Sequence, residues 1–361
     1  MIIPELPAYL SDLGGKDYKG LIIALFTLTA GLSRPFSGKL TDTIGRRPVI
    51  LFGILVCVTC SLIYPLVSTV ATFLFLRLMH GLSTGFAPTA MTTYVADIVP
   101  VHRRGEAMGI IGVSINLGSS ITPPIGSYIA NNMGLPYLFL ASSLVAVFSY
   151  ICVFRIEETL RVTKQFSLRL FALKRNDLIA KEGILPALVC GLSYMGFGAI
   201  ITITPDQCDF LGMTNRGFYF TTFTLCSVLS RLVAGKASDI WGRIVVMRIA
   251  IILLAGSYCL FGFASSPAWL LVGSGMVGFS LGICIPAVFA WAVDLSNEQS
   301  RGKTLATVFI GLEFAIGIGA LLGASIYDND PQNFKYVFMV IGGICLWAYL
   351  FIRQKAVYAE T

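Results

Sequence analysis

The feature that most constrains this chain is its series of long apolar segments. Eleven runs reach the ~18–20 residues that a helix needs to cross a bilayer. Only 12% of the residues are charged, against about a quarter in a soluble domain. The short alternating segments of a membrane β-barrel do not occur. The sequence therefore predicts an all-α polytopic membrane protein. Its spans are expected at about 20–40, 48–66, 70–96, 106–130, 136–154, 183–205, 217–235, 244–263, 267–293, 304–326 and 334–352.

The basic residues indicate which side of the membrane each loop occupies. Of the 26 Lys and Arg residues, nineteen fall in the loops on one side, four in those on the other, and Arg34, Arg77 and Arg231 lie within spans. Because basic loops stay in the cytoplasm, we expect a cytoplasmic C-terminus in the plasma (inner) membrane of the cell. The net charge of +7 then marks orientation and does not indicate a nucleic-acid partner.

An internal repeat divides the chain into two halves. Shifted by the 197 residues that separate Arg34 from Arg231, many positions coincide over more than 70 residues, including Gly81 with Gly278 and Arg104 with Arg301. We expect an N-terminal half over 1–154, a cytoplasmic linker over 155–182 and a C-terminal half over 183–361. Two parallel six-span halves are a known transporter design, with the substrate site between them. The linker is either an amphipathic surface helix or a solvated segment.

The first half shows one span fewer than the second. Residues 1–10, "MIIPELPAYL", form an apolar stub with two prolines that is too short to cross. We expect this stub to be the outer end of a first span that the sequence lacks. A genuine eleven-span protein is the alternative.

A charged hairpin, "SGKLTDTIGRRPVIL", interrupts the apolar runs at 37–51 and recurs at 234–247. Its glycines allow a tight turn, and its aspartate can accept hydrogen bonds from arginine or from a helix N-terminus. We interpret the two copies as a gating latch that holds the halves in one state; the alternative is a turn with orienting charge. The expected latch residues are Gly38, Asp42, Gly45, Arg46, Arg47, Asp97, Gly235, Asp239, Gly242, Arg243 and Asp294.

At these residues the chain resembles the major facilitator superfamily, whose loop between spans 2 and 3 has this pattern. A second motif, in the span near 106–130, resembles that of the drug/proton antiporter (efflux) branch, although Thr122 and Ser127 replace two glycines. An ordinary proline kink is the alternative. The residues that match this motif are Gly109, Gly118, Pro123 and Gly126.

Charged residues within spans are candidate transport residues. Arg77 matches the family's span-4 arginine, and we expect it to face the central cavity in proton coupling or anion contact, rather than to snorkel to the interface. Glu313 stands mid-span and coincides with Asn116 in the repeat. A desolvated carboxyl group can exchange protons near neutral pH, so Glu313 is expected to carry protons or bind a cation. A structural, hydrogen-bonded role is the alternative.

Other residues exclude several function classes. The cysteines of "CVTC", Cys57 and Cys60, lie mid-span and are expected to be packing residues. No metal spacing, nucleotide-binding loop or catalytic constellation occurs, so we predict neither an enzyme nor a metal site. Glu5, Asp12 and Asp17 are expected on the outer surface.

The resemblance implies a secondary active transporter, most simply a monomeric, proton-coupled exporter of small drug-like molecules that works by alternating access. It would use the proton gradient and no cofactor. Two alternatives stay open: a nutrient uptake symporter or uniporter, and a truncated membrane protein that does not transport.

Overall fold

The structure is a computed structural model that describes residues 1–100, 104–160, 167, 179–296 and 301–359. Within these ranges, side chains are described except at 96, 104–109, 232–240, 301–303 and 353–359. The linker expected over 155–182, whether helical or solvated, therefore falls mostly outside the described residues.

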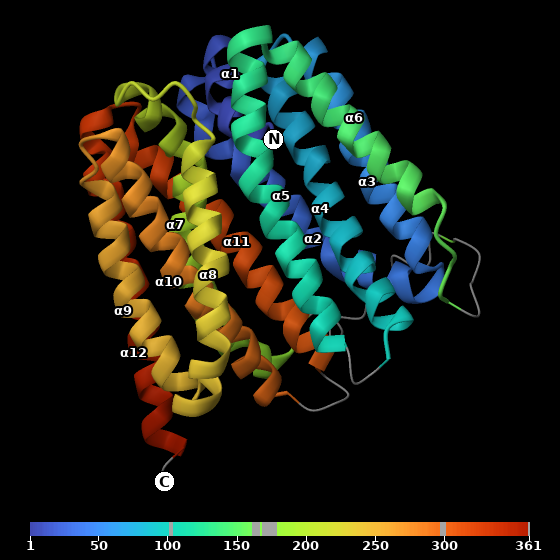
Figure 1. The fold of residues 1–361 in the computed structure, drawn as a ribbon, viewed down its shortest axis with the longest axis vertical. Coiled ribbons are helices and arrows are strands. Elements are labelled where there is room, and N and C mark those ends of the chain that lie inside the picture. Colours follow the sequence, from blue (N-terminus) through green and yellow to red (C-terminus); the bar gives the residue numbers. More distant parts are fainter. Residues whose placement is uncertain (101–103, 161–166, 168–178, 297–300, 360–361) are drawn as a thin grey trace.

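Eleven long helices and one short one build the described part of the chain (Figure 1). Nine of the long helices are long and apolar enough to cross a membrane among the residues described, and α5 and α8 add 30 and 24 residues. The expected spans are thus confirmed to within a few residues at their ends, the last helix extending furthest. The helices are α1 (Leu6–Asp12), α2 (Lys19–Thr43), α3 (Arg46–Ile63), α4 (Val70–Ile98), α5 (Arg104–Met133), α6 (Leu135–Phe154), α7 (Lys181–Phe210), α8 (Phe218–Trp241), α9 (Arg243–Gly262), α10 (Pro267–Asp294), α11 (Arg301–Tyr327) and α12 (Phe334–Ala359).

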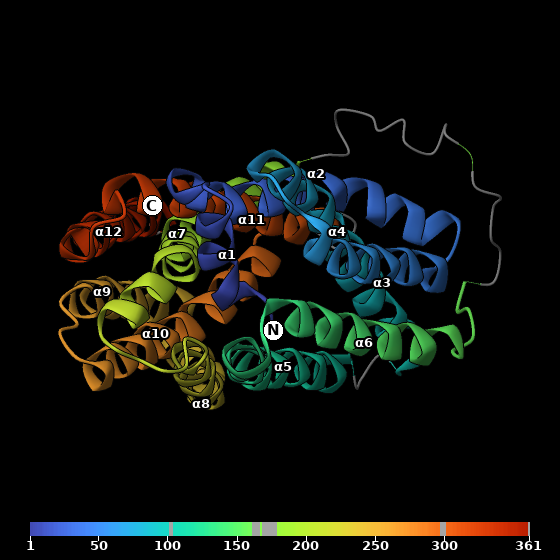
Figure 2. The same cartoon turned by 90° about the horizontal axis from the view of Figure 1, so that it is seen from above.

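The helices form two groups that lie side by side (Figure 2). In the N-terminal half, α4 packs between α2 and α3, and α3 packs on α6. In the C-terminal half, α10 packs in the same way between α8 and α9, and α9 packs on α12. The packing order therefore repeats as the sequence offset predicts.

The repeat extends to the backbone of the two hairpins. Gly45 and Gly242, one offset apart, adopt left-handed φ angles of +119° and +85°. Each directly precedes a helix, α3 or α9. Glycine adopts this conformation without the steric cost of a side chain, so the two glycines make the same turn in both halves.

Two seams join the halves. One is formed by α2 with α11, the other by α5 with α8. Small residues let backbones approach closely in the first: a Cβ on Gly20 would lie 2.9 Å from the Ala320 carbonyl oxygen, and one on Gly317 would lie 2.7 Å from Thr27 Oγ1. Such close contact replaces the hydrophobic force that lipid does not supply.

The two halves differ beside the seams. In the C-terminal half, α7 packs on α11, α12 and α10. The corresponding place in the N-terminal half holds α1 at one end. Beside it lies a cavity of about 370 Å³, which is lined by Met1 and by residues of α3, α4, α5 and α6. The stub at residues 1–10, predicted to be too short to cross a membrane, forms a 3-10 turn at Ile3–Glu5 and most of the seven-residue helix α1.

Candidate functional site

An ion pair joins the two halves in the interior of α2 and α11. Arg34 of α2 donates from NH2 to Glu313 Oε1 of α11 at 2.6 Å, and the two side chains are only 13% and 8% exposed. The guanidinium of Arg34 also lies 4.8 Å from the centroid of the Phe309 ring. Glu313 is therefore not the isolated acid that its span suggested, because Arg34 neutralises it across the seam.

Sequence reasoning placed Arg34 in a span but did not pair it. A signal existed: a buried carboxylate needs a cation, and only three arginines lie within spans. Which of these arginines pairs with Glu313, however, depends on the packing of α2 against α11, and this tertiary contact is not visible in the sequence. Aromatic rings line the neighbourhood, with Phe289 and Phe309 4.7 Å apart.

Arg77 lies inside the N-terminal half rather than on an open cavity. It is 2% exposed, and its Nε donates to the Ile22 carbonyl at 2.9 Å. Its NH1 donates to the Tyr64 hydroxyl at 3.3 Å, and its guanidinium lies 4.5 Å from the centre of the Phe26 ring. The expected cavity-facing orientation is therefore corrected: α2 covers the side chain. Its part in coupling stays a prediction.

Asn116, the repeat counterpart of Glu313, is half-buried on α5. No described residue bridges it to Arg77 or Glu313. The three expected coupling residues thus occupy separate helices, α4, α5 and α11, and only Glu313 belongs to the inter-half pair.

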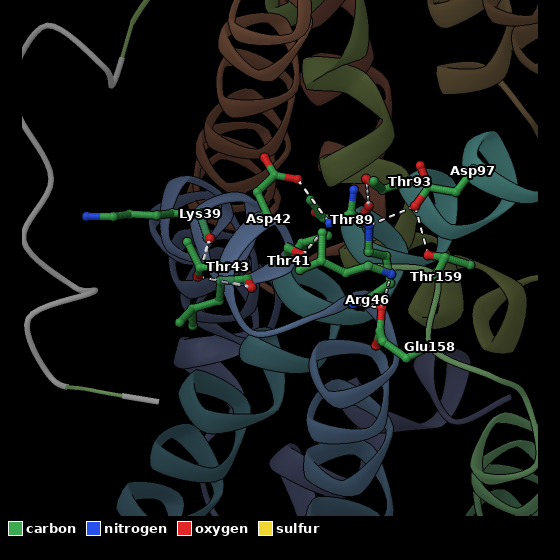
Figure 3. A network of polar contacts seen from close by, with 12 residues as sticks. Lys39, Thr41, Asp42, Thr43, Arg46, Thr89, Thr93, Asp97, Glu158 and Thr159 are labelled. Carbon is green, nitrogen blue, oxygen red and sulfur yellow. Dashed lines mark hydrogen bonds and ion pairs between the residues drawn. The ribbon is translucent and has the colours of Figure 1, made fainter. Parts of the chain in front are cut away.

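At the end of the bundle that carries the hairpins, here called the basic end, the first hairpin forms a polar cluster (Figure 3). Arg46 Nε lies 2.8 Å from Asp97 Oδ2, whereas its NH1 is 3.5 Å from Asp42 Oδ1. Arg46 also donates to the Thr41 carbonyl at 2.8 Å. The Asp42 side chain is 71% exposed, so Asp97 is the stronger partner of Arg46.

Glu158, just after α6, completes this cluster and was missed from the sequence. Its Oε1 accepts from the Arg46 amide at 3.0 Å and its Oε2 from the Arg47 amide at 2.9 Å. A carboxylate is stabilised there because the first amides of α3 are unpaired and carry the positive end of the helix dipole. Thr159 Oγ1 donates to Asp97 Oδ2 at 2.8 Å. A cap that comes from 112 residues away leaves no local sequence signal.

The described contacts of this cluster join α2, α3 and α4 of the N-terminal half to the first residues of the linker after α6. They do not bridge the two halves in this state, so the cross-half contact expected of the latch is not among them. Arg47 donates to the Phe154 carbonyl and lies over the ring of Phe154. Gly38 lies on α2 with open space where its Cβ would be.

The second hairpin repeats the main ion pair. Arg243 Nε lies 3.5 Å from Asp294 Oδ2, which matches Arg46 with Asp97 at the same offset. Both partners are more exposed than in the first copy, at 31% and 55%. The side chain of Asp239 and the surroundings of Gly235 and of Gly109 in the span-5 motif are not among the parts of the chain that the structure describes.

Replacing Gly45 tests the tight turn. A Cβ there would lie 2.5 Å from Glu158 Oε2 and would be strained at φ +119°, so Gly45→Ala is expected to destabilise the protein by about 1–3 kcal/mol. In Gly242→Ala the backbone angle is strained but the added Cβ meets no neighbouring atom, so this variant should lose less stability than Gly45→Ala. Gly38→Ala, inside a helix with free space, should be neutral or stabilising by up to ~1 kcal/mol. Thermal unfolding in detergent measures all three; equal midpoints would contradict the assignment.

A second polar network closes the end of the bundle away from the hairpins, here called the opposite end. Glu5 is 2% exposed, so its expected surface position is wrong. Its Oε2 lies 2.6 Å from Arg216 NH1 and its Oε1 accepts from Ser127 Oγ at 2.6 Å. Arg216 Nε also lies 2.6 Å from Asp209 Oδ1. Burial acts to lower the pKa of Arg216, but the Asp209 hydrogen bond and the Glu5 charge outweigh it and raise that pKa.

Further contacts between the halves gather at this same end. Lys19 of α2 forms an ion pair with Asp206 of α7. Asn131 Nδ2 donates to the Thr214 carbonyl at 2.6 Å, and Thr221 Oγ1 donates to the Ser120 carbonyl at 2.7 Å. The described contacts therefore hold the halves together from the opposite end down to the Arg34–Glu313 pair.

The antiporter-like motif lies in this closed region. Pro123 is buried, and a Cβ on Gly217 of the C-terminal half would lie 2.3 Å from the Pro124 nitrogen. Asn215 Nδ2 donates to the Pro124 carbonyl at 3.0 Å. Gly126 packs against Met1, whereas the Cβ position of Gly118 is open. The prolines thus form part of the α5–α8 seam.

Comparison with protein families decides what kind of molecule this is. The profile described as "Major Facilitator Superfamily" matches residues 1–214 and again 187–359, one match for each half. The chain belongs to the Major Facilitator Superfamily. It is therefore a transporter-type membrane protein and not an enzyme, as the hairpin motif indicated.

Curated relatives and solved structures agree with this assignment. The chain is 32% identical over 171 residues to "Multidrug resistance protein 2" of Bacillus subtilis, an alignment that covers 46% of this chain and 42% of that protein. It is 26% identical to the "Multi-drug resistance efflux pump PmrA" of Streptococcus pneumoniae, over 90% of this chain and 84% of the pump. A crystal structure of the peptide transporter POT has the same fold, with a TM-score of 0.80 at 15% identity over 99% of this chain and 91% of that one.

Proposed function

We propose that the protein is a proton-coupled exporter of small organic molecules that works by alternating access. The observation that carries this proposal is the buried Arg34–Glu313 pair, because it joins the two halves within their helices, and transporters of this design bind their substrate between the halves. The names of the multidrug relatives support export and drug-like substrates.

The pair offers a simple link between protonation and movement. As a carboxylate, Glu313 attracts Arg34 and holds α11 against α2. When Glu313 takes up a proton, this attraction is lost, and the state with the halves apart at that level becomes more favourable. The proton gradient can then drive the exchange of a proton for a substrate.

The contacts between the halves also indicate which side of the membrane the proposed transporter is open to in this structure. The opposite end is closed by the networks of Glu5 and Lys19. With the basic end in the cytoplasm, as the positive-inside rule predicts, this is a state closed toward the outside that takes substrate from the cell interior or from the inner leaflet.

Dye efflux from cells that express the protein tests the proposal. We expect efflux that a protonophore abolishes and that Glu313→Gln lowers at least about tenfold, equal to ~1.4 kcal/mol. Glu182→Gln, the same change at an exposed position in the first turn of α7, is the matched control and should keep the wild-type rate. Efflux that persists with the protonophore, or a full rate in Glu313→Gln, would contradict the proposal.

A further inference from the structure

The repeat gives the inter-half pair a counterpart in the other seam. Shifting Arg34 by the offset gives Arg231 on α8, and shifting Glu313 back gives Asn116 on α5. The two seams match contact by contact at the opposite end. In the α2–α11 seam, Gly20 contacts Ala320 and Leu321; the equivalent contacts in the α5–α8 seam join Gly217 to Pro123 and Pro124. Likewise, Ala24 contacts Gly317 in the first seam, and Thr221 contacts Ser120 in the second.

By this correspondence Arg231 on α8 and Asn116 on α5 hold the repeat-equivalent positions of Arg34 and Glu313, on the two helices of the second seam. The chemistry differs, because an asparagine amide cannot neutralise a guanidinium. Within the part of the chain that the structure describes, Arg231 forms no ion pair, and its buried Nε has no hydrogen-bond partner. An arginine within a membrane span is costly unless an anion or water compensates it. Arg231 thus lacks the counterion that Arg34 has.

Aromatic residues link α7 to α8, the helix that carries Arg231. The rings of Tyr194 and Phe197 on α7 are tilted against each other with 5.1 Å between their centres, and the Phe197 ring centre lies 5.2 Å from that of Phe223 of α8. Since Arg34 and Glu313 cancel each other, the net charge that these central residues present is the single positive charge of Arg231.

We propose that the missing counterion is a carboxylate on the transported molecule, so that the protein prefers small aromatic organic anions. This proposal rests on the proposed function and names its substrate class. The carboxylate would pair with the guanidinium of Arg231 in the fork geometry that arginine favours, with the Asn116 amide as a hydrogen-bond donor. The apolar body would lie against the rings of Tyr194 and Phe197. An inorganic anion at Arg231 is the competing source of the same charge.

Transport of two dyes with one aromatic core, one carrying a carboxylate and one a quaternary ammonium, tests the preference. The protein is reconstituted in liposomes with an imposed pH gradient, and KM is measured for each dye. We expect the wild type to favour the anionic dye, and Arg231→Gln to lower the ratio of anionic to cationic kcat/KM at least tenfold. Asn116→Asp, which supplies a carboxylate from the protein itself, should lower the ratio similarly by competing for Arg231.

Two matched variants control for charge and for the amide change. Arg248→Gln removes an arginine from α9, and Asn132→Asp makes the same change at the far end of α5; neither should alter the ratio. An unchanged ratio in both Arg231→Gln and Asn116→Asp would overturn the inference, as would preferred transport of the cationic dye by the wild type.

Adding sulfate distinguishes a substrate carboxylate from an inorganic anion as the counterion of Arg231. If it saturates the site without being transported and abolishes the Arg231 dependence, an inorganic counterion occupies the site and the inference fails. Absence of gradient-driven transport of either dye would instead overturn the proposed function.

Discussion

Arg34→Met is expected to destabilise the protein by about 3–5 kcal/mol at neutral pH, because it leaves the Glu313 carboxylate buried without its cation. The double variant Arg34→Met with Glu313→Met should recover most of this loss, since two apolar side chains of similar volume replace a buried pair at little cost. Denaturant or thermal unfolding in detergent measures these differences.

The exposed Arg155, just beyond α6, provides the control for this cycle. Arg155→Met should change stability by no more than about 0.5 kcal/mol. If the single and double variants were equally unstable, Arg34 and Glu313 would not be coupled, and the explanation of proton linkage given above would fail with them. We expect the double variant to recover stability but not proton-driven transport, because it lacks the carboxyl group that takes up the proton.

Arg216→Gln is expected to open the opposite end of the molecule. The change removes the cation from the Glu5 carboxylate, whose side chain is 3% exposed, and an unpaired buried charge costs about 3–5 kcal/mol. Opening the seam lets water reach Glu5, so the equilibrium shifts toward the open state. A cysteine introduced by Ser120→Cys, at a buried position of the α5–α8 seam, should then react at least about tenfold faster with a membrane-impermeant maleimide.

Site-specific mass spectrometry separates this label from the native cysteines. Lys16→Gln, which removes an exposed positive charge at the same end, should leave the rate as in the parent. A rate in Arg216→Gln no higher than the parent's would show that the Glu5 network does not hold this end closed.

The membrane helices and their repeat could be predicted because their causes are local. The length of each apolar run and the position of each glycine turn are written in consecutive residues, and the offset that matched Gly45 with Gly242 also matched their backbone angles. The expected latch residues likewise include both members of the Arg46–Asp97 pair and of its copy, Arg243–Asp294.

Contacts between distant segments could not be predicted in the same way. Glu5 was expected on the surface, yet it is buried against Arg216. Glu158, which nothing in the sequence singled out, caps α3. Arg77 and Arg34 are both arginines within apolar spans. Only the packing of α2 decides that one is enclosed in its own half and the other reaches the other half. These outcomes depend on which helix faces which, and no short pattern encodes that.

The small-residue seam between α2 and α11 has a mechanical consequence. Where Gly20 and Gly317 let the helices meet backbone to backbone, few bulky side chains interlock that a rocking motion would have to pull apart. In the alternating access proposed above, such a surface would let one half move against the other with little side-chain rearrangement. The charged contacts between the halves would then contribute much of the barrier to that movement, so that single substitutions at them would change the rate of switching without altering the close-packed seam.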